Sequence, residues 1–129
     1  MIEVLVTIVI VSLGLLGFAG LQMHSLKSNA TALHRSYATM LAYDIADCMR
    51  VNRAAAIAGN YNLDFATAAT SGTVQGDDMV TWKAALASSL PNGQGKITVN
   101  AQGDVQIEVR WAENINSNRT LTFITQTSL

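Results

Sequence analysis

The sequence predicts an α+β fold in which one long N-terminal α-helix packs on a small antiparallel β-sheet. Three observations lead to this prediction. No charged side chain occurs from Val4 to Leu26, an amphipathic pattern continues that stretch to Gly59, and three strand-like segments follow Pro91. At 129 residues the chain is long enough for one small domain with an appendage, and for a modest core.

The N-terminal stretch has the length and composition of a membrane-spanning helix. As an α-helix, Val4 to Leu21 would extend about 27 Å, close to the roughly 30 Å of a bilayer's hydrocarbon core. Three glycines, Gly14, Gly17 and Gly20, are unfavourable in a lone helix in water but common where membrane helices pack closely. No basic residue precedes the stretch, which argues against a cleavable secretory signal and leaves a plain membrane anchor as the alternative.

Glu3 is the one acidic residue beside this apolar stretch. A carboxylate at the edge of a membrane helix is costly and is usually paired with a cation. The next basic side chain along the sequence is Lys27, about 36 Å away along a helix axis. We therefore expect the partner of Glu3 to belong to another molecule.

Beyond the apolar stretch the sequence remains helical in pattern but becomes amphipathic. Apolar or small residues recur at steps of three and four, and only Asn52 breaks the stripe. The stripe consists of Leu26, Ala30, Leu33, Tyr37, Leu41, Ile45, Cys48, Asn52 and Ala55. The pattern predicts one helix of about 55 residues ending at Gly59-Asn60, with residues 1–26 as its transmembrane or filament-core half and residues 27–129 as a globular domain.

The remainder of the chain predicts a loop, a second helix and three strands. The loop covers Tyr61 to Gly76, and the helix after it is expected to be capped by Asp77 or Asp78 and to end at the Pro91-Asn92-Gly93 turn. Met79, Trp82, Leu86 and Leu90 form the apolar stripe of that helix. The strands are expected at Lys96–Ala101, Val105–Trp111 and Leu121–Thr127, with the apolar face of their sheet on the amphipathic half of the long helix.

The chemistry of the sequence does not indicate an enzyme. No nucleophile–base set, metal-ligand spacing or phosphate-binding glycine pattern is present, so no catalytic residue, cofactor or metal is expected. Asp44, Asp47, Arg50 and Arg53 are best explained as i,i+3 ion pairs on a solvated face. With 8 basic and 9 acidic residues and no basic stripe, nucleic acid is not an expected partner. The single cysteine, Cys48, is expected to be a small packed side chain.

The N-terminal segment MIEVLVTIVIVSLGLLGFAGLQ resembles that of type IV pilins, and most closely that of PilV-type minor pilins. The resemblance continues more loosely through MRVNRAAAIAGNY and LPNGQG. In the family, Glu3 corresponds to a glutamate that pairs with the N-terminal amine of a neighbouring subunit. The family's leader, its glycine and the first residues after it are missing here, so the resemblance implies cleavage by prepilin peptidase and methylation of a longer precursor.

The resemblance implies a minor pilin that primes or caps a bacterial type IV pilus. It implies a single-pass inner-membrane protein with a periplasmic C-terminal domain, which later joins the pilus at the cell surface. Its partners would be membrane lipid, other minor pilins, the major pilin and a tip adhesin, in a filament used for adhesion and twitching motility. Apolar side chains would pack in lipid or in the filament, and the three glycines would loosen the helix or admit close packing. The packing residues are Val4, Leu5, Ile8, Val11, Leu15 and Phe18.

Three alternatives differ in function. A minor pseudopilin of a type II secretion system has the same style of N-terminus, and genome neighbourhood would distinguish it. A DNA-uptake pilin would need basic and aromatic residues gathered on one surface, which the balanced charge disfavours. A membrane-anchored enzyme would need a catalytic set, for which the sequence offers no candidate.

Overall fold

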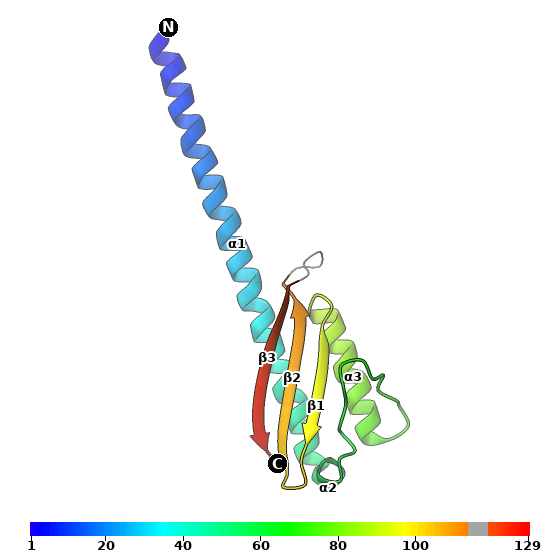
Figure 1. Ribbon diagram of the computed structural model, residues 1–129. Coiled ribbons are helices and arrows are strands. Elements are labelled where there is room, and N and C mark those ends of the chain that lie inside the picture. Colours follow the sequence, from blue (N-terminus) through cyan, green and yellow to red (C-terminus); the bar gives the residue numbers. More distant parts are fainter. Residues whose placement is uncertain (114–118) are drawn as a thin grey trace. The chain divides into compact units, whose positions relative to one another are not determined.

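The computed structural model describes residues 1–113 and 119–129, and it confirms the predicted α+β arrangement (Figure 1). A long N-terminal helix is followed by two shorter helices and a three-stranded antiparallel sheet. The elements are α1 (Ile2–Val51), α2 (Arg53–Ile57), α3 (Val74–Ser89), β1 (Gln94–Val99), β2 (Asp104–Ala112) and β3 (Thr120–Ser128).

The chain forms two compact units, Met1–Leu33 and His34–Leu129, and α1 contributes to both. The first unit is helical from Ile2 onward, and its large apolar side chains are exposed. Within the described residues, α1 is the one helix long and apolar enough to cross a membrane, by length and composition. The second unit contains the sheet, α2, α3 and the C-terminal part of α1.

The long helix ends earlier than its periodicity predicts. Instead of one helix to Gly59, α1 stops at Val51, and α2 forms a separate short helix. Asn52 leaves the helical region, with φ −108° and ψ 48°, although its N–H still donates to the Cys48 carbonyl at 3.0 Å. Its side chain makes no capping bond and instead donates to the Tyr61 hydroxyl at 3.4 Å. The predicted glycine stop is correct for α2, since Gly59 has a φ of 81°.

The face of α1 that packs on the domain is formed by alanines and larger apolar side chains in equal number. Its buried residues are Ala38, Leu41, Ala42, Ile45, Ala46 and Met49. The predicted stripe is correct at Leu41 and Ile45, which are buried, but not at its start, where Leu33 is 53% exposed and Tyr37 is 37% exposed.

Helix α3 begins before the aspartates expected to cap it. Thr73 is the N-cap, and its hydroxyl accepts a hydrogen bond from the Gly76 N–H at 3.2 Å. Asp77 instead accepts the Gly72 N–H at 3.1 Å, and Asp78 lies further along the helix. The end of the helix follows the prediction, because Leu90 is the C-cap and Asn92 adopts a positive φ of 52° in the turn after Pro91.

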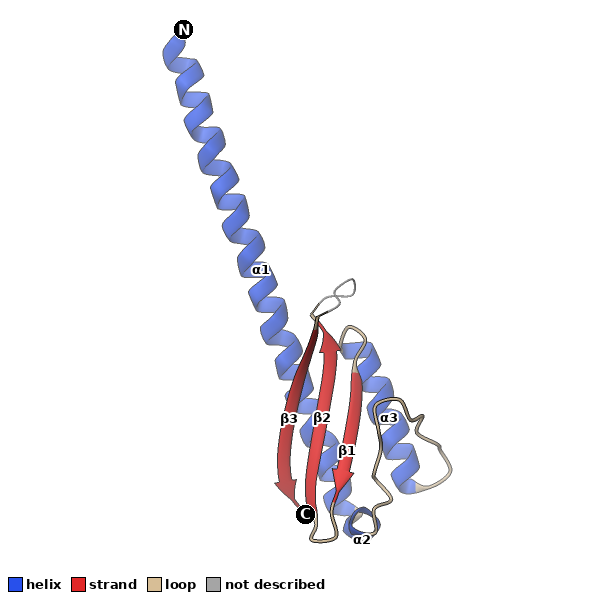
Figure 2. Cartoon of the chain, in the orientation of Figure 1, coloured by secondary structure: helices blue, strands red, loops and turns tan. Residues whose placement is uncertain are grey.

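The strands pair in the order β1-β2-β3, as Figure 2 shows. Their bounds lie within two residues of the predicted ones, and Gly103 makes the turn between β1 and β2 with a φ of 89°. On β2, Val105, Ile107, Val109 and Trp111 are buried. They form one core cluster with residues of α1, α3 and β1, including Trp82. Both tryptophans are thus core residues.

Candidate functional site

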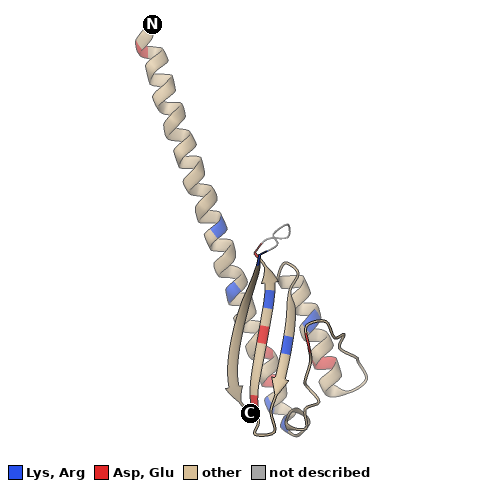
Figure 3. Cartoon of the chain, in the orientation of Figure 1, with Lys and Arg blue, Asp and Glu red and all other residues tan. Residues whose placement is uncertain are grey.

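The candidate docking residue, Glu3, lies in the first turn of α1. Its backbone carbonyl accepts a hydrogen bond from the Thr7 hydroxyl at 2.7 Å, but its carboxylate has no ion-pair or hydrogen-bond partner in the described part of the chain. Figure 3 shows that α1 carries no other charged residue before Lys27. A negative charge at a helix N-terminus is favoured by the helix dipole, so the position is tolerated without a cation in the same helix.

The apolar side chains predicted to pack in lipid or in a filament are exposed in the isolated chain. Their exposed fractions lie between 54% and 65%. The residues are Val4, Leu5, Ile8, Val11, Leu15 and Phe18. A continuous apolar surface of this kind is unfavourable in water and marks a surface that lipid or other protein covers. Which side chains meet lipid and which meet another subunit stays a prediction.

Two hydroxyl side chains within this apolar stretch are satisfied inside the helix. The Thr7 hydroxyl bonds to the Glu3 carbonyl, and the Ser12 hydroxyl donates to the Ile8 carbonyl at 2.6 Å. Such hydroxyl-to-backbone bonds let Ser and Thr occupy an environment without water. The helix therefore presents no unpaired hydroxyl at these two positions.

The three glycines leave free space beside the backbone of the same helix. A Cβ atom added at Gly14, Gly17 or Gly20 would meet no atom within 4 Å. No contact with the described residues therefore requires glycine at these positions. A requirement for glycine would come from the close approach of a helix of another molecule, or from the flexibility that glycine gives a helix. The two explanations make different predictions for alanine variants.

A polar cluster in the domain connects Asn52, which follows α1, to Asp78 of α3 through Tyr61. The Tyr61 side chain is buried, and its hydroxyl donates to Asp78 Oδ2 at 2.6 Å and accepts from Asn52 Nδ2 at 3.4 Å. Burial and the bond to Asp78 raise the pKa of Tyr61 to about 12. Burial, and then the negative charge of Asp78, also raise the pKa of the nearby Cys48 thiol. A raised pKa disfavours the thiolate, which is the nucleophilic form of cysteine.

Lys83 of α3 organises the loop that precedes the helix. Its ammonium donates to the carbonyls of Asp64 and Phe65, both at 3.2 Å, and to the Thr67 carbonyl. Burial lowers the pKa of Lys83. The loop in turn holds the Phe65 ring 3.9 Å from the Arg110 guanidinium, a cation–π contact on the sheet. Sequence reasoning missed both clusters because their members lie far apart along the chain.

The DxxDxxRxxR pattern contains one of its expected i,i+3 ion pairs. Arg50 Nη1 lies 2.6 Å from Asp47 Oδ1 on an exposed face. The described residues contain no group of three or more His, Cys, Asp or Glu side chains that could hold a metal ion.

Comparison with known families identifies the chain over its central part. The model of the Tt1218-like family, described as type IV pilin Tt1218, matches residues 20–88, more than half of the 129 residues. The chain belongs to this type IV pilin family. No curated protein and no solved structure matches it.

Membership establishes the chain as a pilin, a structural protein associated with other pilus components. The apolar N-terminal helix fits a membrane-anchored pilin. The family match begins at Gly20 and therefore covers neither Glu3 nor the apolar residues before it. The roles of those residues stay predictions.

Proposed function

We propose that this pilin is a minor subunit that helps to prime, or that caps, a bacterial type IV pilus. The resemblance of its N-terminus to PilV-type minor pilins supports the minor role. Before assembly the subunit would reside in the inner membrane, with its C-terminal domain in the periplasm. Other minor pilins and the major pilin would be its partners, with a tip adhesin as a further one.

The observation on which the proposal rests is the unpaired carboxylate of Glu3 beside an exposed apolar helix surface. When that helix leaves lipid for a filament of similar helices, the charge needs a cation in surroundings of low dielectric constant. The N-terminal amine of a neighbouring subunit would provide it. Leaving one member of a buried ion pair unpaired costs about 3–5 kcal/mol, which is enough to decide whether a subunit docks.

The test substitutes Glu3 in the full-length precursor, as Glu3→Gln and Glu3→Ala. Both variants should insert in the membrane at the normal level and carry a folded domain, because Glu3 lies outside the unit that contains the core. Both should reduce the yield of pili sheared from cells, and alanine should be at least as harmful as glutamine, which keeps a polar amide. Asp44→Asn, which removes an exposed carboxylate of the domain, serves as the control.

Normal piliation by the Glu3 variants at normal protein level would contradict the docking role. A defect in secretion with normal pili would instead indicate the pseudopilin alternative.

A further inference from the structure

The two edges of the sheet differ in whether their backbone groups are paired. The outer edge of β1 is closed by the loop before α3, where Leu63 and Ile97 exchange two backbone hydrogen bonds of 3.0 and 2.8 Å. Beside them, the Asn62 side-chain oxygen accepts the Val99 N–H at 2.6 Å. The other edge is β3, and no strand of residues 1–113 or 119–129 pairs with its far side.

The hydrogen bonds at the two ends of the β2–β3 ladder show which groups of β3 point to the open edge. The Glu113 N–H donates to Arg119, and the Leu129 N–H donates to Gly103. Because hydrogen-bonded and non-hydrogen-bonded pairs alternate in an antiparallel ladder, the odd-numbered residues of β3 bond to β2. The even-numbered residues direct their N–H and C=O groups outward. They are Thr120, Thr122, Ile124, Gln126 and Ser128.

The open edge also lacks the usual protection against pairing. Natural edge strands are commonly short or carry lysine, proline or a bulge. Strand β3 is nine residues long, reads TLTFITQTS, and contains no charge and no proline. It pairs with β2 in an unbroken register along its whole length, and Ile124 on it is 54% exposed. Such an edge is a template for strand addition.

At its N-terminal end, β3 borders a hollow between the sheet and α1. The side chains of an added strand that faced the inner side of the sheet would enter this hollow, because side chains alternate between faces. The hollow is lined by Arg35, Thr39, Trp111, Leu121, Thr122 and Phe123. Its walls therefore combine apolar side chains with one cation.

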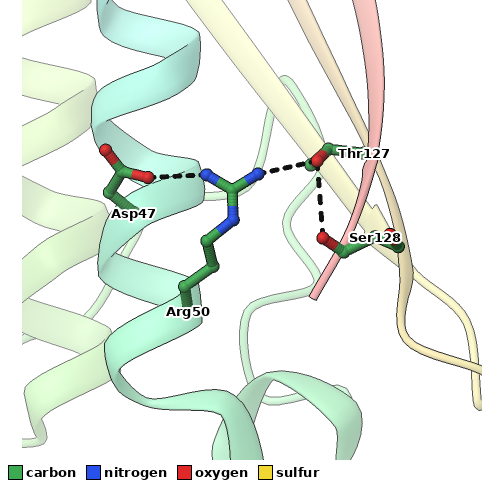
Figure 4. Close-up of polar contacts among 4 residues, drawn as sticks. All are labelled: Asp47, Arg50, Thr127 and Ser128. Carbon is green, nitrogen blue, oxygen red and sulfur yellow. Dashed lines mark hydrogen bonds and ion pairs between the residues drawn. The ribbon is translucent and has the colours of Figure 1, made fainter.

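Within the described residues, two donors at this hollow have no acceptor, the exposed guanidinium of Arg35 and the buried indole N–H of Trp111. The Arg35 guanidinium forms no hydrogen bond or ion pair with any described residue, and the buried Trp111 Nε1 is also unpartnered within that part of the chain. At the other end of the strand the situation differs, as Figure 4 shows. There Arg50 bonds to Asp47 at 2.6 Å and to the Thr127 hydroxyl at 2.7 Å, and so links α1 to β3.

We propose that the β3 edge binds an extended segment of another protein, which adds a fourth strand and places a carboxylate side chain beside Arg35. A second copy of this chain fits poorly. Its β3 contains no acidic residue to pair with Arg35, and the edge of its β1 is already closed. The partner is thus a different chain whose strand carries Asp or Glu at a position facing inward.

The test measures binding of defined peptides to the full chain in detergent micelles. The probe is the alternating peptide acetyl-TVTETVT-amide, compared with versions in which Gln or Lys replaces Glu. The Glu peptide should bind severalfold more tightly than the Gln peptide, and the Lys peptide should bind least. Binding should slow amide hydrogen exchange at Thr122, Ile124 and Gln126, whose N–H groups point to the open edge.

Matched variants separate backbone pairing from charge. Thr122→Pro removes one outward N–H without breaking the ladder to β2 and should abolish binding, whereas Thr122→Val should retain it. Arg35→Gln should remove the preference for Glu over Gln, whereas Arg53→Gln, an exposed arginine of α2, should leave it unchanged.

Three results would overturn the proposal. They are no amide protection by any of the peptides, equal affinity for the Glu and Lys peptides, and dimers of the chain that require β3 and exclude the peptides. Because these measurements involve neither Glu3 nor pili, their failure is distinguishable from failure of the proposed function.

Discussion

At the scale of single residues, the two tryptophans have similar burial but different bonding. Trp82 and Trp111 are 4% and 2% exposed. The Trp82 indole donates to the Leu41 carbonyl at 2.8 Å and so ties α3 to α1, whereas the Trp111 indole N–H has no acceptor within the described residues. Burial alone therefore does not rank their contributions, because a satisfied donor and an unsatisfied one differ in free energy.

We predict that Trp82→Phe destabilises the domain more than Trp111→Phe does. The first change breaks a buried hydrogen bond, with a net contribution of about 0.5–1.5 kcal/mol, and the second breaks none. Trp111→Ala, which removes the whole ring, should cost about 3–5 kcal/mol. Thermal unfolding of the full chain in micelles, followed by near-ultraviolet circular dichroism, measures these effects. Equal melting temperatures for the two phenylalanine variants would contradict the ranking.

A pH dependence follows from Tyr61. Its pKa is raised from 10.0 to about 12 in the folded state, mainly by burial and then by the bond to Asp78. The folded state thus holds the phenol proton more tightly than the unfolded state does. The resulting stability is present in full below pH 10 and is lost as the pH rises from 10 to about 12.

Tyr61→Phe should therefore lose less stability than the natural chain across that pH range. At neutral pH the variant should be the less stable of the two, because the bond to Asp78 is gone. The measurement is the midpoint of urea unfolding at several alkaline pH values, with the difference between the two chains as the quantity of interest. A constant difference from pH 8 to 12 would show that Tyr61 does not titrate as its burial implies.

At the scale of elements, the strands and the long helix could be predicted because their patterns are local. Alternation on β2 and the charge-free stretch of α1 depend on adjacent residues alone. The face of α1 that packs on the domain was predicted only in part: Leu41 and Ile45 are buried as expected, but half of the buried residues are alanines, which do not stand out in the sequence as core positions. The predicted start of α3 was also wrong. Thr73 caps the helix, although Asp77 and Asp78 are the more obvious caps in the sequence.

The capping role of Thr73 leads to a further prediction. Thr73→Ala should destabilise the domain by about 1 kcal/mol, because the Gly76 N–H would lose its acceptor. Thr81→Ala, at an exposed position in the middle of the same helix, is the matched control and should have little effect or a slightly stabilising one. The same unfolding experiment compares them. A larger loss for Thr81→Ala would argue against the cap.

At the scale of the whole molecule, the candidate site could be located from the sequence, whereas the domain contacts could not. Glu3 and the apolar residues after it stand out by composition, but the partner expected for Glu3 belongs to another molecule. Sequence analysis missed the contacts that hold the domain together, because the residues that form them lie far apart along the chain. Arg50 and Thr127 are 77 positions apart, and no local pattern connects them.

The last prediction concerns the independence of the two units. Removing residues 1–26 should leave a soluble domain, because the buried core begins at Ala38 and the removed residues contribute none of it. The exposed apolar surface that α1 would present to water is largely removed with them, although Leu33 and Tyr37 remain exposed. The fragment should therefore melt cooperatively at the same temperature as the domain of the full chain. A second truncation after Leu33, at the boundary between the compact units, should melt at a similar temperature. Aggregation of both fragments, with no cooperative transition, would show that the N-terminal helix is needed for folding of the domain.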